Sequence, residues 1–384
     1  MIKSRNEANR GILFSLLLIL SITSCIVVQA NDQQITLRKL GQIYTGGDAM
    51  DVQVVGEIAY VADMNTGLRI INVSDPVNPI EIGHYYDGGR AHQLFVDGEI
   101  VYLADHTDGL EIINVSDPAN PIEQGNFSEG GRVADVQVIE DIAYIIEGGL
   151  KILNISDLSS PSVLGFYRGN DYLSDVKIDG DIAYLADQRR GLVLIDVNDP
   201  SNPSELAIYH DAGTAANVQI VGDTAYLADW ESGLEIINVS DPNNLTRLGG
   251  YDDGGNAGDL VVVEDIAYVG DWDNGLEIIY IGNPANPIEL AQYYDGGLAL
   301  GVYVLNNIVY VADKSGGLEI LEIEGNVTNL TLTSTLTPTT PASTTNLTPT
   351  PTPTDSTPVS GWSFLVLLLS LIVVLWKNRK QKFN

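Results

Sequence analysis

The chain has 384 residues, of which 45% are apolar, so it is long enough for one large domain with a sizeable core and accessory segments. It carries 51 acidic against 19 basic residues, and a formal net charge of −32 excludes a body that binds nucleic acid or an anionic membrane surface through its overall field. Its single cysteine, Cys25, excludes an intramolecular disulfide and a cysteine-based zinc site.

The first 30 residues have the three parts of a secretory signal peptide. Lys3, Arg5 and Arg10 form a basic start, an apolar run follows, and small residues lead to Ala30. This order predicts export, with cleavage after Ala30. The segment around Cys25 also resembles a bacterial lipobox, so attachment of a lipid to Cys25 is an alternative.

Seven copies of one pattern fill the chain between residues 31 and 325. Each copy contains an apolar strand with a tyrosine, and successive tyrosines lie 42, 42, 40, 42, 42 and 42 residues apart. They are Tyr60, Tyr102, Tyr144, Tyr184, Tyr226, Tyr268 and Tyr310. A period near 42 residues without helical periodicity is typical of β-propeller blades. The sequence therefore predicts an all-β fold, a seven-bladed β-propeller of four-stranded blades.

The second copy shows how one blade divides into four strands, A to D. We predict strand A at 92–96, strand B at 100–105, strand C at 110–116 and strand D at 122–128, with Gly, Asp, Asn and Pro residues in the turns between them. Strand C is apolar on both alternations, which is typical of a sheet buried on both faces. One blade cannot cover both faces alone, so each copy needs a neighbour on either side.

The two ends of the repeat region complement each other. The seventh copy continues into a Thr-rich segment without a D strand, whereas a spare D-like segment, residues 34–47, precedes the first A strand. The sequence LGQIYTGG in this segment matches IGHYYDGG at 82–89. We therefore expect the N-terminal strand to complete the last blade and to remove the open sheet edge.

GLVLIDVNDP at 191–200 and its relatives in the other copies resemble the LVIVD repeat of archaeal and bacterial surface and secreted proteins. The resemblance covers about residues 34–325 and implies a β-propeller in which the A strands lie innermost and the B–C and D–A loops share one face. The third copy departs from the pattern at 157–160, and the seventh lacks the Asp-Pro turn. The resemblance implies no shared chemistry, so function must be argued from individual residues.

Four aspartates occupy the same place in strand A of different copies, namely Asp51, Asp135, Asp175 and Asp259. Near the mouth of a propeller channel, these carboxylates suit a cation with oxygen ligands, Ca²⁺ being the candidate. The alternative is that each caps a turn or accepts a backbone hydrogen bond from the neighbouring blade. Acidic residues in the B–C loops, such as those in 105–109, are interpreted as turn caps. Otherwise the sequence predicts no cofactor.

Two further pairs are candidates for ligand binding. Trp230 and Trp272 occupy matching B–C loop positions of adjacent copies, where a tight turn does not need an indole, and they suit stacking on sugars or anchoring a protein partner. His92 and His106 fall on one face of the second copy. The structural alternatives are tryptophans packed against neighbouring loops and histidines that serve turns or the surface. No nucleophile elbow, P-loop or HExxH motif is present, so no catalytic residue is assigned.

Three segments follow the repeats. Residues 326–358 are rich in Thr, Pro and Ser, which predicts an extended stalk. Residues 359–376 are apolar, and at about 1.5 Å per residue they reach ~27 Å, just enough to cross a bilayer core. The basic tail at 377–384 predicts a cytoplasmic end and an external body. A C-terminal sorting signal that a protease removes is the alternative.

Glycosylation sequons occur in the repeats and in the stalk. The candidates for modification are Asn126, Asn244, Asn326, Asn329 and Asn346. Four more sequons end strand C, where we expect poorer access, at Asn72, Asn114, Asn154 and Asn238.

Together these features predict a non-catalytic, membrane-anchored propeller at the cell surface. Its role is recognition, adhesion or a place in the surface coat, its partner is an extracellular protein or glycan, and the B–C and D–A loop face around copies five and six is the expected binding face. An extracellular lyase or hydrolase with a cation at the acidic channel mouth is the alternative. The sequence names neither the ligand nor the oligomeric state, and it does not separate cation binding from a salty habitat as the reason for the acidic charge.

Overall fold

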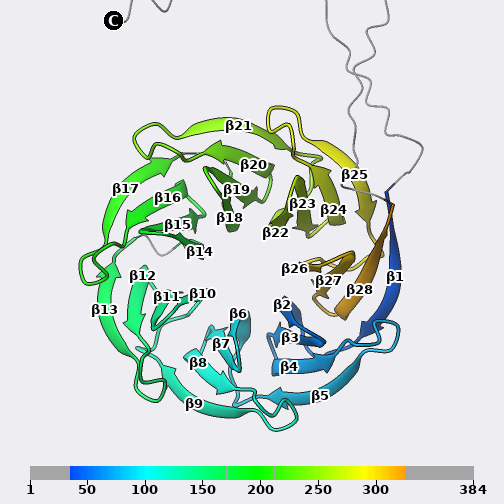
Figure 1. Cartoon of the computed structure of the whole chain (residues 1–384), viewed down its shortest axis with the longest axis horizontal. Helices are drawn as coiled ribbons and strands as arrows, with labels where there is room; N and C mark the ends of the chain where they lie inside the picture. The colour runs from blue at the N-terminus through cyan, green and yellow to red at the C-terminus, as the bar shows by residue number, and fades with distance from the viewer. Residues whose placement is uncertain (1–34, 170–171, 211–212, 326–384) are drawn as a thin grey trace, which may run out of the picture. The chain divides into compact units, whose positions relative to one another are not determined.

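The computed structural model describes residues 35–169, 172–210 and 213–325, which form seven four-stranded antiparallel sheets arranged in a ring (Figure 1). Within these ranges there is no helix, and hence none long and apolar enough to cross a membrane. The predicted seven-bladed, all-β propeller is confirmed. The predicted signal peptide (1–30), stalk (326–358), membrane span (359–376) and tail (377–384) lie outside the described residues.

Each blade has the same strand order from the channel outwards, and blade 1 holds β2–β5, blade 2 holds β6–β9, and so on to blade 7 with β26–β28 and β1. The innermost strands are β2 (Ala49–Val55), β6 (Ala91–Asp97), β10 (Val136–Ile139), β14 (Leu173–Asp179), β18 (Asn217–Val221), β22 (Ala257–Val263) and β26 (Gly301–Leu305). The second strands are β3 (Ile58–Asp63), β7 (Ile100–Asp105), β11 (Ile142–Ile146), β15 (Ile182–Asp187), β19 (Thr224–Asp229), β23 (Ile266–Asp271) and β27 (Ile308–Asp313). The third strands are β4 (Gly67–Asn72), β8 (Gly109–Asn114), β12 (Leu150–Asn154), β16 (Gly191–Asp196), β20 (Gly233–Asn238), β24 (Gly275–Tyr280) and β28 (Gly317–Glu324). The outermost strands are β5 (Ile80–Tyr85), β9 (Ile122–Phe127), β13 (Ser162–Tyr167), β17 (Ser204–Tyr209), β21 (Thr246–Tyr251), β25 (Ile288–Tyr293) and β1 (Thr36–Ile43).

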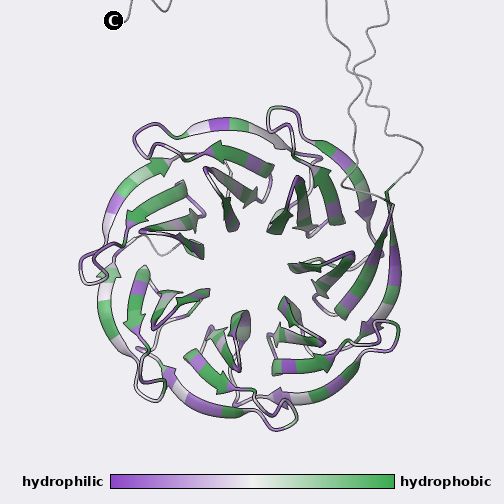
Figure 2. Ribbon diagram, in the orientation of Figure 1, coloured by the Kyte–Doolittle hydropathy of each residue, from purple (hydrophilic) through white to green (hydrophobic). Residues whose placement is uncertain are grey.

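The core consists of layers between neighbouring blades. In one layer, Tyr60 and Leu68 of blade 1 pack with Leu94, Leu103 and Ile113 of blade 2. Second and third strands are buried on both alternations, whereas the outermost strands alternate between exposed and half-buried residues. Figure 2 shows the same division, with hydrophobic residues along the inner strands and mixed residues on the outer ones. Each blade is thus stable only between its neighbours, as the repeat predicts.

The turn that links the third and outermost strands explains much of the repeated sequence. Asn114 Oδ1 accepts hydrogen bonds from both the backbone N and the Oγ of Ser116, at 2.9 and 2.6 Å. The turn then passes close to β5 of the preceding blade. A Cβ on Gly83 of β5 would lie 1.9 Å from the carbonyl oxygen of Pro118, so only glycine fits there. The repeated Asn, Ser, Pro and Gly residues therefore fix both the turn and the contact between blades.

The N-terminal strand closes the ring, which confirms the predicted role of residues 34–47. β1 pairs with β28 in antiparallel register, from Thr36 opposite Glu324 to Ile43 opposite Leu318. Leu37 packs against the apolar layer between blades 6 and 7, and Ile43 packs against the layer between blades 7 and 1. The seventh sheet thereby has four strands, like the other six, and the edge of β28 is covered.

Candidate functional site

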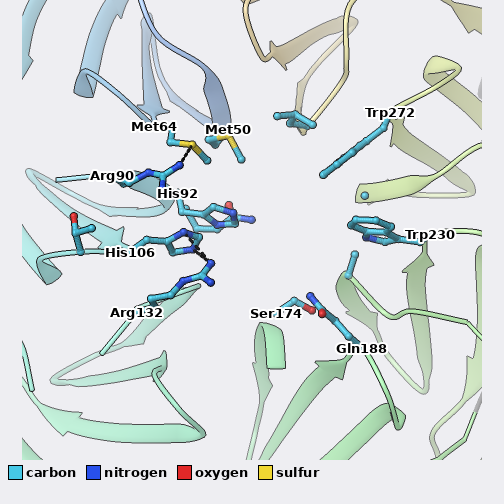
Figure 3. A pocket seen from close by; sticks show the side chains of 15 residues that line it. Met50, Met64, Arg90, His92, His106, Arg132, Ser174, Gln188, Trp230 and Trp272 are labelled. Carbon is cyan, nitrogen blue, oxygen red and sulfur yellow. Dashed lines mark hydrogen bonds between the residues drawn. The ribbon is translucent and has the colours of Figure 1, made fainter. Parts of the chain in front are cut away.

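A cavity of about 510 Å³ lies at the centre of the ring, on the face formed by the B–C loops, which join second to third strands, and the D–A loops, which join successive blades (Figure 3). All seven blades contribute to its lining. One repeated position at the start of the innermost strands supplies Met50, His92, Ser174, Ala216, Gly258 and Leu300. Because these residues differ while the scaffold is shared, their chemistry is free to serve a ligand.

Trp230 and Trp272 line one side of this cavity, each directly after the second strand of its blade. Their ring centroids lie 4.8 Å apart and the planes are tilted by 48°, so the two half-buried indoles form one aromatic surface. The backbone of Trp230 has a positive φ of 21°. Its carbonyl oxygen accepts a hydrogen bond of 3.2 Å from the backbone N of Ala257. A Cβ on Gly258 would lie 2.4 Å from Trp272 Nε1, so this glycine makes room for the indole. The structure therefore brings the two predicted tryptophans together.

His92 and His106 lie across the cavity from the tryptophans (Figure 3). Their rings stack with centroids 4.1 Å apart and planes 23° apart. His92 Nδ1 lies 3.2 Å from the carbonyl oxygen of Ala134, and Arg132 Nη2 lies 3.1 Å from His106 Nδ1. Burial, followed by nearby positive charge, lowers the pKa of His92 to about 4 and that of His106 to about 3. Both rings are therefore neutral at neutral pH and offer hydrogen-bonding groups rather than charge.

The charge of the cavity is opposite to that of the protein as a whole. Among the described residues that line it, Arg90 and Arg132 are basic and none is acidic, in a chain with a net charge of −32. Both arginines are exposed, and Arg90 Nη2 contacts Met64 Sδ at 3.0 Å. This local reversal favours an anionic group in the cavity.

Sequence reasoning missed both arginines, although a signal for them exists. Each ends a Gly-Gly-Arg triplet in a D–A loop, at 88–90 and at 130–132. The corresponding position of blade 1 is Asp48 and that of blade 6 is Asn256. A comparison of the seven copies column by column would have marked the two basic residues as exceptions.

Three of the four predicted ring aspartates, Asp51, Asp175 and Asp259, each directly follow a residue that lines the cavity. The fourth, Asp135, directly precedes the innermost strand β10. Each carboxylate accepts a hydrogen bond from the backbone of the next blade: Leu94 N to Asp51 at 3.0 Å, Val176 N to Asp135 at 2.8 Å, Val218 N to Asp175 at 2.9 Å and Val302 N to Asp259 at 2.7 Å. The ring thus joins blades, which is the alternative role that the sequence left open. Three acidic clusters in the described ranges bring ligand atoms within 4.8 Å of one another, and none contains a ring aspartate. Cation binding by the ring stays a prediction.

The channel also holds a basic side chain that sequence reasoning missed. Lys177 Nζ in β14 lies 2.9 Å from Asp175 Oδ1 and 3.9 Å from Asp135 Oδ2. Burial opposes its charge, but the two carboxylates outweigh this effect and raise the pKa of Lys177. A comparison of the seven copies would have marked Lys177 as an exception. Blades 1 and 3 have Gln53 and Gln137 at the same position, where each accepts a backbone hydrogen bond. An ammonium group of the chain itself therefore offsets part of the ring's charge.

We expect the chain to become more stable as the pH falls from about 8 to about 6.5. Burial raises the pKa of Asp51 to about 6 and that of Asp175 to about 7, and it raises the pKa of Asp259 well above its ordinary value. A carboxyl group whose pKa is higher in the folded than in the unfolded state binds an extra proton on folding, so its stabilisation is lost as the pH rises through the folded-state pKa. The neutral His92 and His106 oppose part of this gain as the pH approaches the ordinary histidine pKa of 6.5, but the three carboxyl groups outweigh them.

Scanning calorimetry in EDTA measures this dependence. The melting temperature should rise by about 3 °C over that interval, the amount expected for a gain on the order of 1 kcal/mol. A melting temperature that falls on acidification would contradict the assignment of raised carboxyl pKa values.

The glycosylation candidates divide by position. Asn126 and Asn244 are exposed, which agrees with their selection as accessible sites, whereas Asn326, Asn329 and Asn346 lie outside the described residues. The sequons that end the third strands are half-buried, and in the first of them Asn72 Oδ1 accepts the hydroxyl of its own sequon serine at 2.6 Å. Their expected poor access has a structural basis in this turn.

A family model described as the LVIVD repeat matches the chain seven times, at residues 46–87, 88–129, 130–168, 172–211, 212–253, 254–295 and 296–337. The matches cover most of the chain and run in step with the seven blades. No curated protein matches the chain.

Solved propellers share the fold at low sequence identity. A catalytically inactive virginiamycin B lyase from Staphylococcus aureus, solved with quinupristin, is 11% identical with a TM-score of 0.62 and covers 75% of this chain and 99% of its own. The β-propeller domain of Cps50 (Swd1) from Myceliophteria thermophila is 10% identical with a TM-score of 0.58, over 74% and 99% of the two chains. The computationally designed Ika8 protein is 12% identical with a TM-score of 0.53, over 77% and 98%. At such identities the likeness shows the fold alone.

Proposed function

The chain belongs to the LVIVD repeat family, and on this scaffold we propose that its central cavity recognises an acidic glycan outside the cell. The observation that carries the proposal is the charge of the cavity, where Arg90 and Arg132 stand without an acidic neighbour in the lining. A strongly acidic surface repels anions in general, so a basic, concave site admits those that fit it. Guanidinium groups are well suited to carboxylates because they donate two parallel hydrogen bonds.

The other lining residues suit a sugar. The aromatic surface of Trp230 and Trp272 offers an apolar platform for the face of a sugar ring. Gln188 and Ser174, together with the neutral imidazole of His92, provide donors and acceptors for hydroxyl groups. A uronic-acid sugar combines the ring face, the hydroxyls and the carboxylate that this lining would bind.

Placement at the cell surface belongs to the proposal. The signal peptide (1–30), stalk (326–358), apolar span (359–376) and basic tail (377–384) support an anchored protein with its propeller outside. Such an arrangement would hold the cavity at a distance from the membrane, where it meets extracellular glycans.

An extracellular lyase or hydrolase is the second candidate, and the stacked histidines in the cavity are the observation that favours it. A general base works best with a pKa near the working pH. Burial lowers the pKa of His92 to about 4 and that of His106 to about 3, so neither ring is a strong base near neutrality. No carboxylate hydrogen-bonds to either ring among the contacts of the described residues. These properties favour binding over catalysis.

An array of acidic and neutral glycans, with extracellular proteins printed beside them, tests the proposal on the full chain in detergent. We expect binding to acidic glycans, weakened at least about 10-fold when Arg90→Gln and Arg132→Gln are combined, since each lost charged contact costs on the order of 1 kcal/mol or more. Arg38→Gln is the matched control and should leave binding unchanged. It removes an exposed arginine of the outermost strand β1, which pairs with Glu324 of β28. Binding to neutral glycans alone, or to proteins alone, would refute the proposed ligand class, and cleavage of a bound glycan would establish the enzyme instead.

A further inference from the structure

Three acidic clusters recur at one place in different blades, away from the central cavity. They are Asp87, Asp108 and Glu111 in blade 2, Asp253, Asp271 and Glu277 in blade 6, and Asp295, Asp313 and Glu319 in blade 7. In each cluster the ligand atoms lie within 4.8 Å of one another. A D–A loop supplies the first acid, the end of the second strand or the B–C loop supplies the next, and the third strand supplies a buried glutamate.

In blade 3 a lysine occupies the place that the glutamate has in these clusters. Lys151 takes the register position of the glutamate, since Lys151 lies opposite Ile145 as Glu277 lies opposite Val269. Its Nζ lies 2.6 Å from Glu129 Oε2 and 2.6 Å from Glu147 Oε2. A positive group thus lies between the D–A loop acid Glu129 and Glu147, the acid that directly follows the second strand.

Blade 7 reaches the same result with a different residue. Lys39 of the closing strand β1 extends its Nζ to 3.0 Å from Asp295 Oδ2 and also contacts Glu319. The ammonium group here comes from the outermost strand rather than the third. Blades 3 and 7 therefore each place a lysine ammonium group at the equivalent position, although the two lysines come from different strands.

Blades 2 and 6 have the acids but no such cation. Within the described ranges, no Lys or Arg forms an ion pair with any of the six acids of these two clusters. The outermost strand places another acid where blade 7 has Lys39, because Glu123 lies opposite Ile113 and Glu289 opposite Ile279. The chain thus leaves both clusters without a counter-charge.

Buried oxygen atoms without partners point to a missing ligand at both places. Glu111 is 2% exposed and Glu277 is 3% exposed, and Oε1 of each has no hydrogen-bond partner. A buried carboxylate oxygen that lacks a partner loses hydration without compensation. A bound cation would supply the missing contact.

We propose that blades 2 and 6 each bind a calcium ion at the place where blades 3 and 7 hold a lysine ammonium. The ligands are oxygen atoms only, which Ca²⁺ prefers, and each cluster combines acids of the loops or strand ends with a glutamate of the third strand. The charges agree as well. Glu129, Glu147 and Lys151 in blade 3 leave one negative charge, and a divalent ion among the three acids of blade 6 leaves one as well.

Equilibrium dialysis with radioactive calcium tests the proposal on the full chain in detergent, after removal of metal with EDTA and in about 0.15 M KCl, which screens weak surface binding. The expected result is two tightly bound ions, with one lost in Glu111→Gln, the other in Glu277→Gln and both in the double variant. Glu319→Gln in blade 7 is the matched control and should retain two, because Lys39 already occupies that place. No bound calcium, or two ions retained by the double variant, would overturn the proposal. Loss of calcium only with Asp51→Asn would assign the ion to the channel ring instead.

Melting temperatures separate loss of the ion from loss of the fold. Calcium at about 100 times its dissociation constant should raise the melting temperature of the wild type by about 5 °C or more. The double variant should show no calcium response but should melt above the wild type in EDTA, because each glutamine removes a buried carboxyl group from a crowded acidic cluster. A variant that merely folds poorly would melt lower in EDTA, and that result would count against the proposal.

Discussion

A chain that lacks residues 31–44 is expected to melt at least about 10 °C below the whole chain. The deletion removes β1, the fourth strand of blade 7, and leaves the outer edge of β28 unpaired, while β27 still pairs with its inner edge. It also takes Leu37, Leu40 and Ile43 out of the apolar layers on both sides of that blade, and the buried Ile35 with them. Four apolar side chains at about 1.5–3 kcal/mol each when fully buried, reduced because three are half-buried, amount to roughly 5 kcal/mol.

Such a loss is comparable with the total stability of many domains, which is about 5–15 kcal/mol. The exposed edge of β28 is in addition a template for pairing with other chains, so we expect aggregation as well. Thr36→Ala, at an exposed position of the same strand, is the control and should shift the melting temperature by less than about 1 °C. A deletion variant with an unchanged transition in calorimetry would show that β1 does not hold the ring closed.

The combined substitution of Trp230→Ala and Trp272→Ala should weaken glycan binding at least about 30-fold. Anchor aromatic residues typically cost about 2 kcal/mol or more each when truncated. Here the two indoles contact each other with centroids 4.8 Å apart, so their contributions overlap, and the expected loss is smaller than the sum of two independent anchors. A double-mutant cycle with both single variants should therefore show coupling.

Isothermal titration with a tetrameric uronic-acid oligosaccharide measures this effect. Tyr294→Ala is the matched control, since it removes a 58% exposed aromatic ring that is not in the lining of the central cavity. Circular dichroism must show both proteins folded. Undiminished binding by the folded double variant would move the site away from the tryptophans, to the channel or to another face.

The propeller could be predicted because its information is local and repeated. The sequence contains seven copies, and each has one strand with a tyrosine and turn residues in fixed places. Some strands are apolar at successive positions, which predicts blades that must be covered by neighbours on both faces. In the second blade the predicted strands agree with β6, β7, β8 and β9 to within two residues at each end. The spare segment at 34–47 also predicted the closing strand, because a missing strand and an unpaired one are both visible in the sequence.

The cavity was predictable only in part, because it depends on contacts across the ring. Trp230 and Trp272 could be selected from matching loop positions, but their meeting inside the cavity rather than on the rim required the structure. Arg90 and Arg132 lie 42 residues apart in sequence, and the charge that they give the cavity runs against the composition of the chain. Lys177 and the lysines of blades 3 and 7 show the same limit, since each matters through partners that other segments bring close.

Tryptophan fluorescence during titration with a uronic-acid tetramer and with its carboxyl-reduced form tests the central claim most directly. The claim is that Arg90 and Arg132 bind a carboxylate of the ligand and that the indoles of Trp230 and Trp272 stack on the face of its sugar ring. We expect the acidic tetramer to change the emission and to bind at least about 10-fold more tightly than the reduced form, since a charged hydrogen bond contributes about 1.5–3 kcal/mol. The variant without Trp230 and Trp272 should show no change. Equal affinity for the two forms, or an emission change that persists in that variant, would contradict the claim.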